Sequence, residues 1–236
     1  MPDADNGSEC VRGLLGGTFD PVHNGHLHLA RHAAARFGLD GVLFMPARTP
    51  PHKPGRRIAP ADHRLAMLRR AVADAPAFRV SDRELRRPGP SYTVDTLRAL
   101  RETEPAIRYR LLLGSDMLGD LHKWREVEAV LRLGEPIVAA RPGGDLPPDH
   151  PVFHADGEGV AVEEAAAWLR TVLAPPLHPF AAQLAGSLLP LPPAPVSSTE
   201  VRRRCRAGEP LDGLVPPAVA AYLRDHRLYT GDPETD

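Results

Sequence analysis

Short apolar runs alternate with helical patterns over the first 140 residues of the chain. The apolar runs are 11–15, 42–45, 78–81, 107–113 and 136–140, and the helical patterns are about 25–38, 62–74, 92–102 and 124–133. Apolar runs of this length are typical of strands that are covered on both faces. A helix between successive strands returns the chain to the same end of the sheet, so the strands run parallel. The pattern therefore predicts an α/β fold with a doubly wound, mostly parallel sheet that binds ligands at the carboxyl ends of its strands.

The rest of the chain divides into a segment of weak patterning, two helices and two tails. Residues 142–195 are rich in proline, and we expect an irregular insertion with one or two short helices, within 162–173 and 180–189. Residues 197–206 and 216–227 predict two C-terminal helices. We expect a disordered N-terminus over 1–10, a single domain over 11–230 and a short tail over 231–236.

Charge and composition limit the classes of partner. The formal net charge is −1, which provides no overall basic field for a nucleic acid. No apolar run approaches the roughly 18–20 residues that cross a bilayer. Cys10 and Cys205 are the two cysteines and form no CxxC pair, so the sequence predicts no disulfide framework. We expect a cytoplasmic protein without a nucleic-acid or membrane partner.

The turn between the first strand and the first helix is suited to binding a phosphate group. Gly16 and Gly17 allow a ligand to approach the backbone, and His23 and His26 follow where the helix begins. A helix N-terminus offers unpaired N–H groups and a partial positive charge, so both imidazoles could face one anion. The alternatives are two surface histidines or a zinc site, and the zinc site lacks nearby cysteines or a third ligand. No GxGxxG follows the first strand and no GxxxxGK[ST] occurs, which disfavours a dehydrogenase and a P-loop.

A second helix start lies near the other end of the chain. Ser197 and Glu200 have the Ser-x-x-Glu spacing of a capping box. Ser198 and Thr199 then fall in the first helical turn, beside Arg202. Hydroxyl groups, free N–H groups and a guanidinium would meet there, which suits an anion.

Two motifs resemble those of a known family. GGTFDPVHNGHL, residues 16–27, resembles the HxGH signature of the nucleotidylyltransferase superfamily, and it is most similar to that of bacterial nicotinate-nucleotide adenylyltransferases. PVSSTEVR, residues 195–202, resembles the family's ISSTxIR signature, with Val196 and Val201 in place of isoleucine. The resemblance implies a Rossmann-like nucleotidylyltransferase fold. It also implies catalytic roles for His23, His26 and Arg202, and ATP contacts for Gly16, Gly17, Thr18, Phe19, Ser197, Ser198 and Thr199.

Three further segments match the part of the family that binds the adenylyl acceptor. TPPHK, residues 49–53, includes His52 and Lys53, which the resemblance places near the substrate; a basic surface turn is the alternative. SYTVDTL, residues 91–97, includes Tyr92 and Thr93, expected at the pyridine carboxylate. LLLGSDMLGDLHKW, residues 111–124, includes Asp116 for the ribose hydroxyls and Trp124, which either stacks on the pyridine ring or packs in the core.

The reaction implied by the resemblance is adenylyl transfer from ATP to nicotinate mononucleotide, giving deamido-NAD and pyrophosphate. We expect Mg²⁺ to arrive with ATP, without a metal site on the protein. Another acceptor, such as nicotinamide mononucleotide or pantetheine phosphate, and a non-catalytic nucleotide sensor are the alternatives. The sequence is also compatible with a homo-oligomer.

Overall fold

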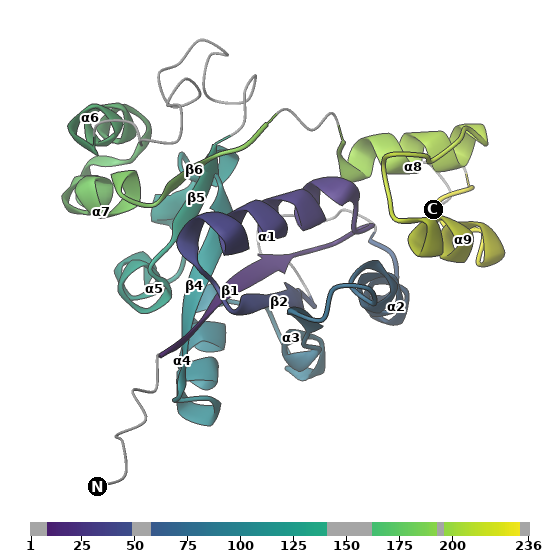
Figure 1. Cartoon of the computed structure of the whole chain (residues 1–236), viewed down its shortest axis with the longest axis horizontal. Helices are drawn as coiled ribbons and strands as arrows, with labels where there is room; N and C mark the ends of the chain where they lie inside the picture. Colours follow the sequence, from purple (N-terminus) through teal and green to yellow (C-terminus); the bar gives the residue numbers. More distant parts are fainter. Residues whose placement is uncertain (1–8, 49–57, 141–161, 193–195, 232–236) are drawn as a thin grey trace, which may run out of the picture.

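The computed structural model describes residues 9–48, 58–140, 162–192 and 196–231. Six parallel strands form one sheet in the order β3-β2-β1-β4-β5-β6 (Figure 1). The strands are β1 (Cys10–Gly17), β2 (Gly41–Pro46), β3 (Phe78–Val80), β4 (Ile107–Gly114), β5 (Ile137–Ala140) and β6 (Leu188–Pro190). The doubly wound parallel sheet that the sequence predicts is confirmed, and β1 begins one residue earlier than expected.

Helices connect the strands and close the chain. They are α1 (Asn24–Phe37), α2 (Ala61–Ala71), α3 (Arg83–Arg86), α4 (Thr93–Thr103), α5 (Val127–Gly134), α6 (Val162–Val172), α7 (Ala181–Ala185), α8 (Ser198–Ala207) and α9 (Pro217–Asp225), with 3-10 turns at Ser115–Met117, Leu121–Lys123 and Pro175–Phe180. None of these helices is long and apolar enough to span a bilayer, a finding limited to the described residues.

Two apolar cores lie on opposite faces of the sheet, and successive strand residues alternate between them. In β1, Leu14 belongs to one core and Leu15 to the other. In β4, Leu111 and Leu113 join the first core and Leu112 joins the second. The first core is completed by α4 to α7 and the second by α1, α2, α8 and α9. Burial on both faces explains why these strands read as continuous apolar runs.

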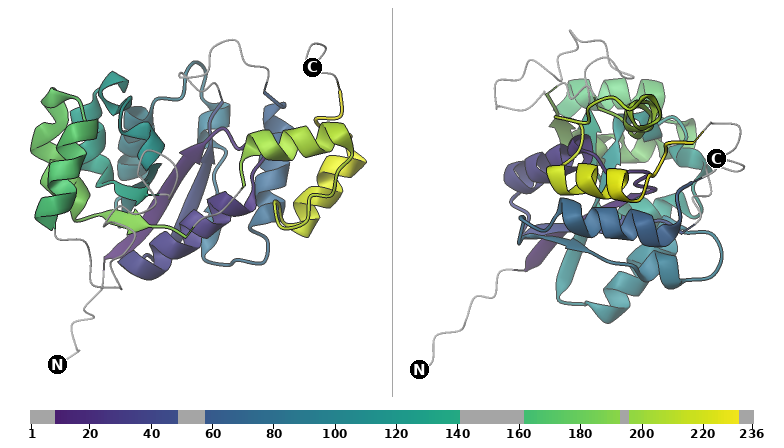
Figure 2. Two further views of the ribbon diagram at one scale, coloured as in Figure 1. Left: turned by 90° about the horizontal axis from the view of Figure 1, so that it is seen from above. Right: turned by 90° about the vertical axis from the view of Figure 1, so that its right-hand side faces the viewer.

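The described part of the proline-rich segment has the two short helices that the sequence predicts and, in addition, a strand that it does not. It contains α6 and α7, which pack side by side, and then β6, which extends the sheet beyond β5. Figure 2 shows α6 and α7 at one side of the sheet and α8 and α9 at the other. The strand was missed because it has only three residues and ends in Pro190. Proline is tolerated there because β6 is an edge strand.

The strand order indicates where a ligand crevice is expected, because the connections diverge between β1 and β4. From β1 the chain continues to β2 and β3 on one side, whereas β4, β5 and β6 lie on the other side. Connections that leave neighbouring parallel strands in opposite directions open a crevice at their carboxyl ends. Here the two strands are β1 and β4, which end in Gly17 and Gly114.

Candidate active site

The loop from β1 to α1 is shaped by a buried aromatic residue. Phe19 has a φ of 50° and is 2% exposed, so the chain turns sharply while the ring enters the core. Its ring meets that of Phe44 with 6.0 Å between centroids and lies edge-on to His26 at 5.0 Å. Phe19 therefore determines the shape of the loop and contributes to the placement of His26. An added Cβ at Gly16 would have no atom within 4 Å, so the backbone before the turn is open.

His23 and His26 lie together at the start of α1. His23 is the N-cap residue and is 5% exposed. Its backbone N–H donates to Nδ1 of His26 at 3.2 Å, and the two rings stack with 3.7 Å between centroids. Because Nδ1 of His26 accepts this bond, the neutral ring carries its hydrogen on Nε2. The two imidazoles thus form one unit at a helix N-terminus.

Gly25 provides the space that this pair needs. A Cβ at Gly25 would lie 3.0 Å from Nδ1 of His23 and 3.1 Å from Cγ1 of Val196. Val196 directly precedes α8, so the beginnings of the two helices touch at this glycine. The middle of the HxGH motif is therefore a point of close packing between segments far apart in the sequence.

The start of α8 is joined to the β1–α1 loop by hydrogen bonds. The Ser198 hydroxyl donates to the carbonyl of Pro21 at 3.0 Å. Nη1 of Arg202 donates to the carbonyl of Asp20, and Nη2 donates to the Thr199 hydroxyl at 3.2 Å. We call residues 16–26 and 197–202 the two-helix site. Figure 1 shows the beginning of α8 beside the N-terminal end of α1.

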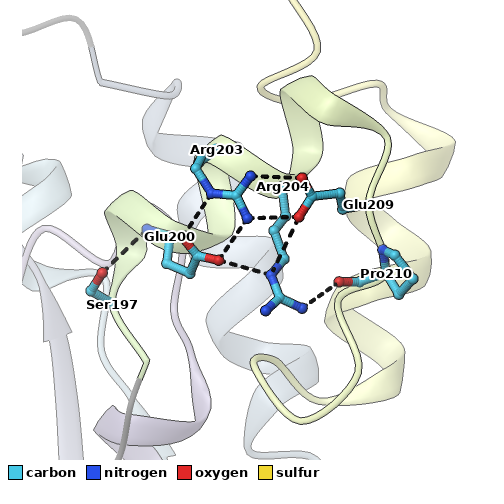
Figure 3. Close-up of polar contacts among 6 residues, drawn as sticks. All are labelled: Ser197, Glu200, Arg203, Arg204, Glu209 and Pro210. Carbon is cyan, nitrogen blue, oxygen red and sulfur yellow. Dashed lines mark hydrogen bonds and ion pairs between the residues drawn. The ribbon is translucent and has the colours of Figure 1, made fainter.

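Only half of the predicted capping box forms at α8. The Ser197 side chain accepts from the N–H of Glu200 at 3.2 Å, as expected for an N-cap. The Glu200 carboxylate instead binds Arg203 at 2.9 Å and Arg204 at 2.8 Å (Figure 3). These two cations hold the pKa of Glu200 low, at about 2. Arg203 continues to Glu209, so ion pairs span α8 from its first turn to its end.

A buried arginine of α2 binds the loops around the site through hydrogen bonds to their carbonyl groups. Arg64 of α2 is 2% exposed and donates to the carbonyls of Thr18, Ala47 and Ala59 at 2.7, 2.9 and 3.0 Å. Burial lowers its pKa, and the nearby Asp20 opposes this shift. Sequence reasoning missed Arg64, Asp20 and Gly25. Asp20 and Gly25 stand inside the quoted motif, and an arginine on the helical pattern of 62–74 was the available signal for Arg64.

Asp116 lies at the end of β4, the strand next to β1. Its carboxylate folds back over Gly114, where an added Cβ would lie only 2.1 Å from Oδ1. Asp116 is exposed, and its oxygens lie at the carboxyl edge of the sheet. The fold therefore brings Asp116 to the same carboxyl edge of the sheet as Gly16 and Gly17.

The structure describes three of the five other residues that are predicted to bind the adenylyl acceptor. Tyr92 caps α4, Thr93 is the first residue of that helix, and the guanidinium of Arg125 lies 4.9 Å from the centre of the Tyr92 ring. Trp124 is half-buried and packs against the core that α4 and α5 share, as does Tyr92. His52 and Lys53 lie outside the described residues.

A groove of about 1170 Å³ lies beside the two-helix site. It runs between α1, the end of α2 and the connection from α8 to α9, and it meets the site at Asn24. Asn24 closes that end of the groove, because its backbone and side-chain nitrogens donate to the carbonyls of Leu214 and Gly213, each at 2.8 Å. None of the described strand-end residues lines the groove.

Comparison with known proteins agrees with this geometry. A family model described as cytidylyltransferase-like matches residues 14–204. A protein of Symbiobacterium thermophilum named "Probable nicotinate-nucleotide adenylyltransferase" is 42% identical over 218 residues, which cover 92% of this chain and 93% of that protein. A protein of the same name from Geobacter sulfurreducens is 38% identical over 238 residues, covering 93% of this chain and 98% of that one.

A solved structure shows the same fold. The structure of Plasmodium falciparum nicotinic acid mononucleotide adenylyltransferase complexed with NaAD aligns with a TM-score of 0.67 at 15% identity, covering 94% of this chain and 98% of that chain. The fold, the two-helix site and the sequence relatives agree. The chain belongs to the cytidylyltransferase-like family and, within it, to the nicotinate-nucleotide adenylyltransferases.

Proposed function

We propose that this enzyme transfers the adenylyl group of ATP to nicotinate mononucleotide, releasing pyrophosphate and forming deamido-NAD, a step of NAD biosynthesis. The observation that carries the proposal is that the N-termini of α1 and α8 meet in one site. Helix α1 contributes two imidazoles, and α8 contributes hydroxyl groups and a guanidinium. Such a site suits the triphosphate of ATP. The names of the sequence relatives support nicotinate mononucleotide as the acceptor.

The chemistry requires positioning and charge stabilisation more than proton abstraction. The 5′-phosphate of the acceptor has a second pKa near 6, so it is largely a dianion at neutral pH. It attacks the α-phosphorus in line, and the bond to the bridging oxygen of pyrophosphate breaks. In this proposal His23, His26 and Arg202 donate hydrogen bonds to the developing charge. Gly16, Gly17, Thr18, Ser197, Ser198 and Thr199 line the path of the triphosphate.

Magnesium enters this proposal as part of the substrate. Within the described ranges, no group of three or more His, Cys, Asp or Glu residues is placed to hold a metal ion. Mg²⁺ keeps several waters and is commonly held by substrate phosphates. We therefore propose that Mg²⁺ arrives on ATP, where it offsets the repulsion between the two phosphate groups.

We place the binding site for the acceptor, nicotinate mononucleotide, at the carboxyl edge of the sheet next to β4. Asp116 would accept hydrogen bonds from ribose hydroxyls, because a carboxylate offers several acceptor positions. Thr93 at the start of α4 would face the pyridine carboxylate, since a helix N-terminus favours a negative group. Tyr92, Trp124, His52 and Lys53 complete the proposed acceptor side.

A panel of acceptors tests the reaction. Purified enzyme with ATP and Mg²⁺ is offered nicotinate mononucleotide, nicotinamide mononucleotide and pantetheine phosphate, and pyrophosphate release is measured. We expect the highest kcat/KM with nicotinate mononucleotide. A higher value with either other acceptor would reassign the substrate, and ATP binding without pyrophosphate release would indicate a nucleotide sensor.

Replacement of one histidine tests the site. We expect His26→Ala to lower kcat by about 10²–10³-fold, the scale of losing one donor to a developing oxyanion. His32→Ala is the matched control, because His32 lies on the same helix and its ring contacts the carbonyl of His28 instead of the site. Steady-state kinetics and a thermal unfolding curve for both variants separate chemistry from folding. Normal turnover in His26→Ala would remove His26 from the mechanism.

A further inference from the structure

Asp20 is a buried carboxylate where three parts of the chain meet. It belongs to the β1–α1 loop and is 5% exposed. Its Oδ1 accepts from the N–H of Ala59, before α2, at 3.1 Å, and from the Tyr229 hydroxyl, after α9, at 2.6 Å. Its Oδ2 lies 3.7 Å from Nη1 of Arg202, and the same nitrogen donates to its backbone carbonyl. Asp20 thus connects the C-terminal segment to a cation of the two-helix site.

Tyr229 is held in place for this contact. It has a φ of 61°, so the chain turns in the left-handed region after α9 and returns the ring toward the body of the protein. Burial and the adjacent Asp20 charge raise the pKa of the Tyr229 hydroxyl, which therefore remains a proton donor. The donated bond fixes which way the Asp20 carboxylate faces.

We propose that Tyr229 is a positioning residue for ATP binding, which keeps the Asp20 carboxylate from forming a direct hydrogen bond with the guanidinium of Arg202. The proposal rests on the proposed function, because it assigns Arg202 to the triphosphate. Asp20 and Arg202 form an ion pair in which Oδ2 is 3.7 Å from Nη1, longer than a hydrogen bond. The two bonds to Oδ1 hold the carboxylate at this distance, so the guanidinium keeps N–H groups for an incoming anion.

Loss of the Tyr229 hydroxyl would change this balance. Asp20 Oδ1 would keep only the N–H of Ala59, and the carboxylate could turn toward Arg202. A direct bond between Asp20 and Arg202 competes with the phosphate oxygens for the same donors. The effect falls on the triphosphate and not on the mononucleotide, so KM for ATP and KM for the acceptor respond differently.

The test compares two tyrosine-to-phenylalanine variants. Tyr229→Phe removes the hydroxyl that binds Asp20, and Tyr222→Phe removes a hydroxyl of α9 that lies 2.9 Å from Nδ1 of His63 on α2. Both delete one oxygen that ties the C-terminal region to the body, and only the first acts on Asp20. We expect Tyr229→Phe to raise KM for ATP about 3- to 10-fold, the scale of one hydrogen bond, with KM for nicotinate mononucleotide within about twofold of wild type. Tyr222→Phe should leave both constants at wild-type values.

A binding measurement keeps this proposal separate from the proposed reaction. The affinity of each variant for a non-hydrolysable ATP analogue with Mg²⁺ is measured by calorimetry, which needs no turnover. If wild type binds the analogue but releases no pyrophosphate with any acceptor, the reaction is wrong and the role of Tyr229 is judged from affinity alone. Equal constants for wild type and Tyr229→Phe, or equal losses in both variants, would overturn the role of Tyr229. Failure of wild type to bind the analogue would overturn both.

Discussion

Individual residues in this site are constrained mainly by the space around them. Gly25 allows His23 and Val196 to approach, and Gly114 allows the Asp116 carboxylate to fold back over the strand end. Neither glycine has a φ in the left-handed region, so the requirement is for volume and not for an unusual backbone conformation. Glycine at such positions lets two groups come closer than any side chain would permit.

Gly25→Ala tests this requirement. The added methyl group lies 3.0 Å from His23, so the imidazole or the segment before α8 must shift. Alanine favours a helix by about 0.5–1 kcal/mol over glycine, so we expect the variant to fold. We expect kcat/KM to fall about 10- to 100-fold, because small misplacements of reacting groups are costly.

Gly186→Ala is the control for this substitution. Gly186 lies between α7 and β6, and an added Cβ there would be 3.8 Å from its nearest neighbours. Its kinetic constants should match wild type. Unchanged kcat/KM in Gly25→Ala would show that the histidine pair tolerates displacement.

At the scale of elements, the start of α4 is anchored by a buried acidic residue on α3. Glu84 is 7% exposed and accepts from the Thr96 hydroxyl at 2.6 Å, which in turn accepts from Arg87 at 2.9 Å. Burial raises the pKa of Glu84, although Thr96, Ser91 and Arg87 oppose the shift. Helix α3 was missed from the sequence because four residues carry too little periodicity to reveal a helix.

Glu84→Gln should change how the free energy of unfolding depends on pH. A carboxyl with a raised pKa in the folded state stabilises the fold below its unfolded pKa, and this contribution is lost as the pH rises through the folded pKa. Glutamine does not titrate, so the stability of the variant relative to wild type should be higher at pH 8 than at pH 5. Urea unfolding at both pH values measures the difference. Glu102→Gln, on the exposed surface of α4, is the control, and a pH-independent difference for Glu84→Gln would contradict the expectation.

For the whole molecule, α6 and α7 belong to the same core as the strands β4 and β5. Ala165 and Leu169 of α6 and Leu184 of α7 are fully buried together with Val138 of β5. The described part of the proline-rich segment is therefore structural, and it covers one face of the sheet. A molecule built this way is expected to unfold in one cooperative transition.

Leu169→Ala tests that integration. Leu169 is 0% exposed, and truncation of a buried leucine costs about 2–5 kcal/mol. Val162→Ala is the matched control, because Val162 begins the same helix and is 43% exposed. We expect a single urea transition at lower denaturant for Leu169→Ala and nearly no change for the control. A separate early transition would show that α6 and α7 form an independent unit.

The sequence by itself determined the parallel sheet, the strand-to-helix turn with its two histidines and the N-cap at Ser197. Each of these depends on residues within a few positions of one another, which periodicity and capping rules detect. Only the tertiary structure decided the contact of Gly25 with Val196, the burial of Arg64, the pairing of Glu200 with Arg203 and Arg204, and the bond from Tyr229 to Asp20. Most of these contacts join segments separated by tens to hundreds of residues. In the case of Glu200, several hydrogen-bond partners lie within reach, and the folded chain determines which of them it binds. Such choices depend on packing and charge in the folded chain, and no local pattern records them.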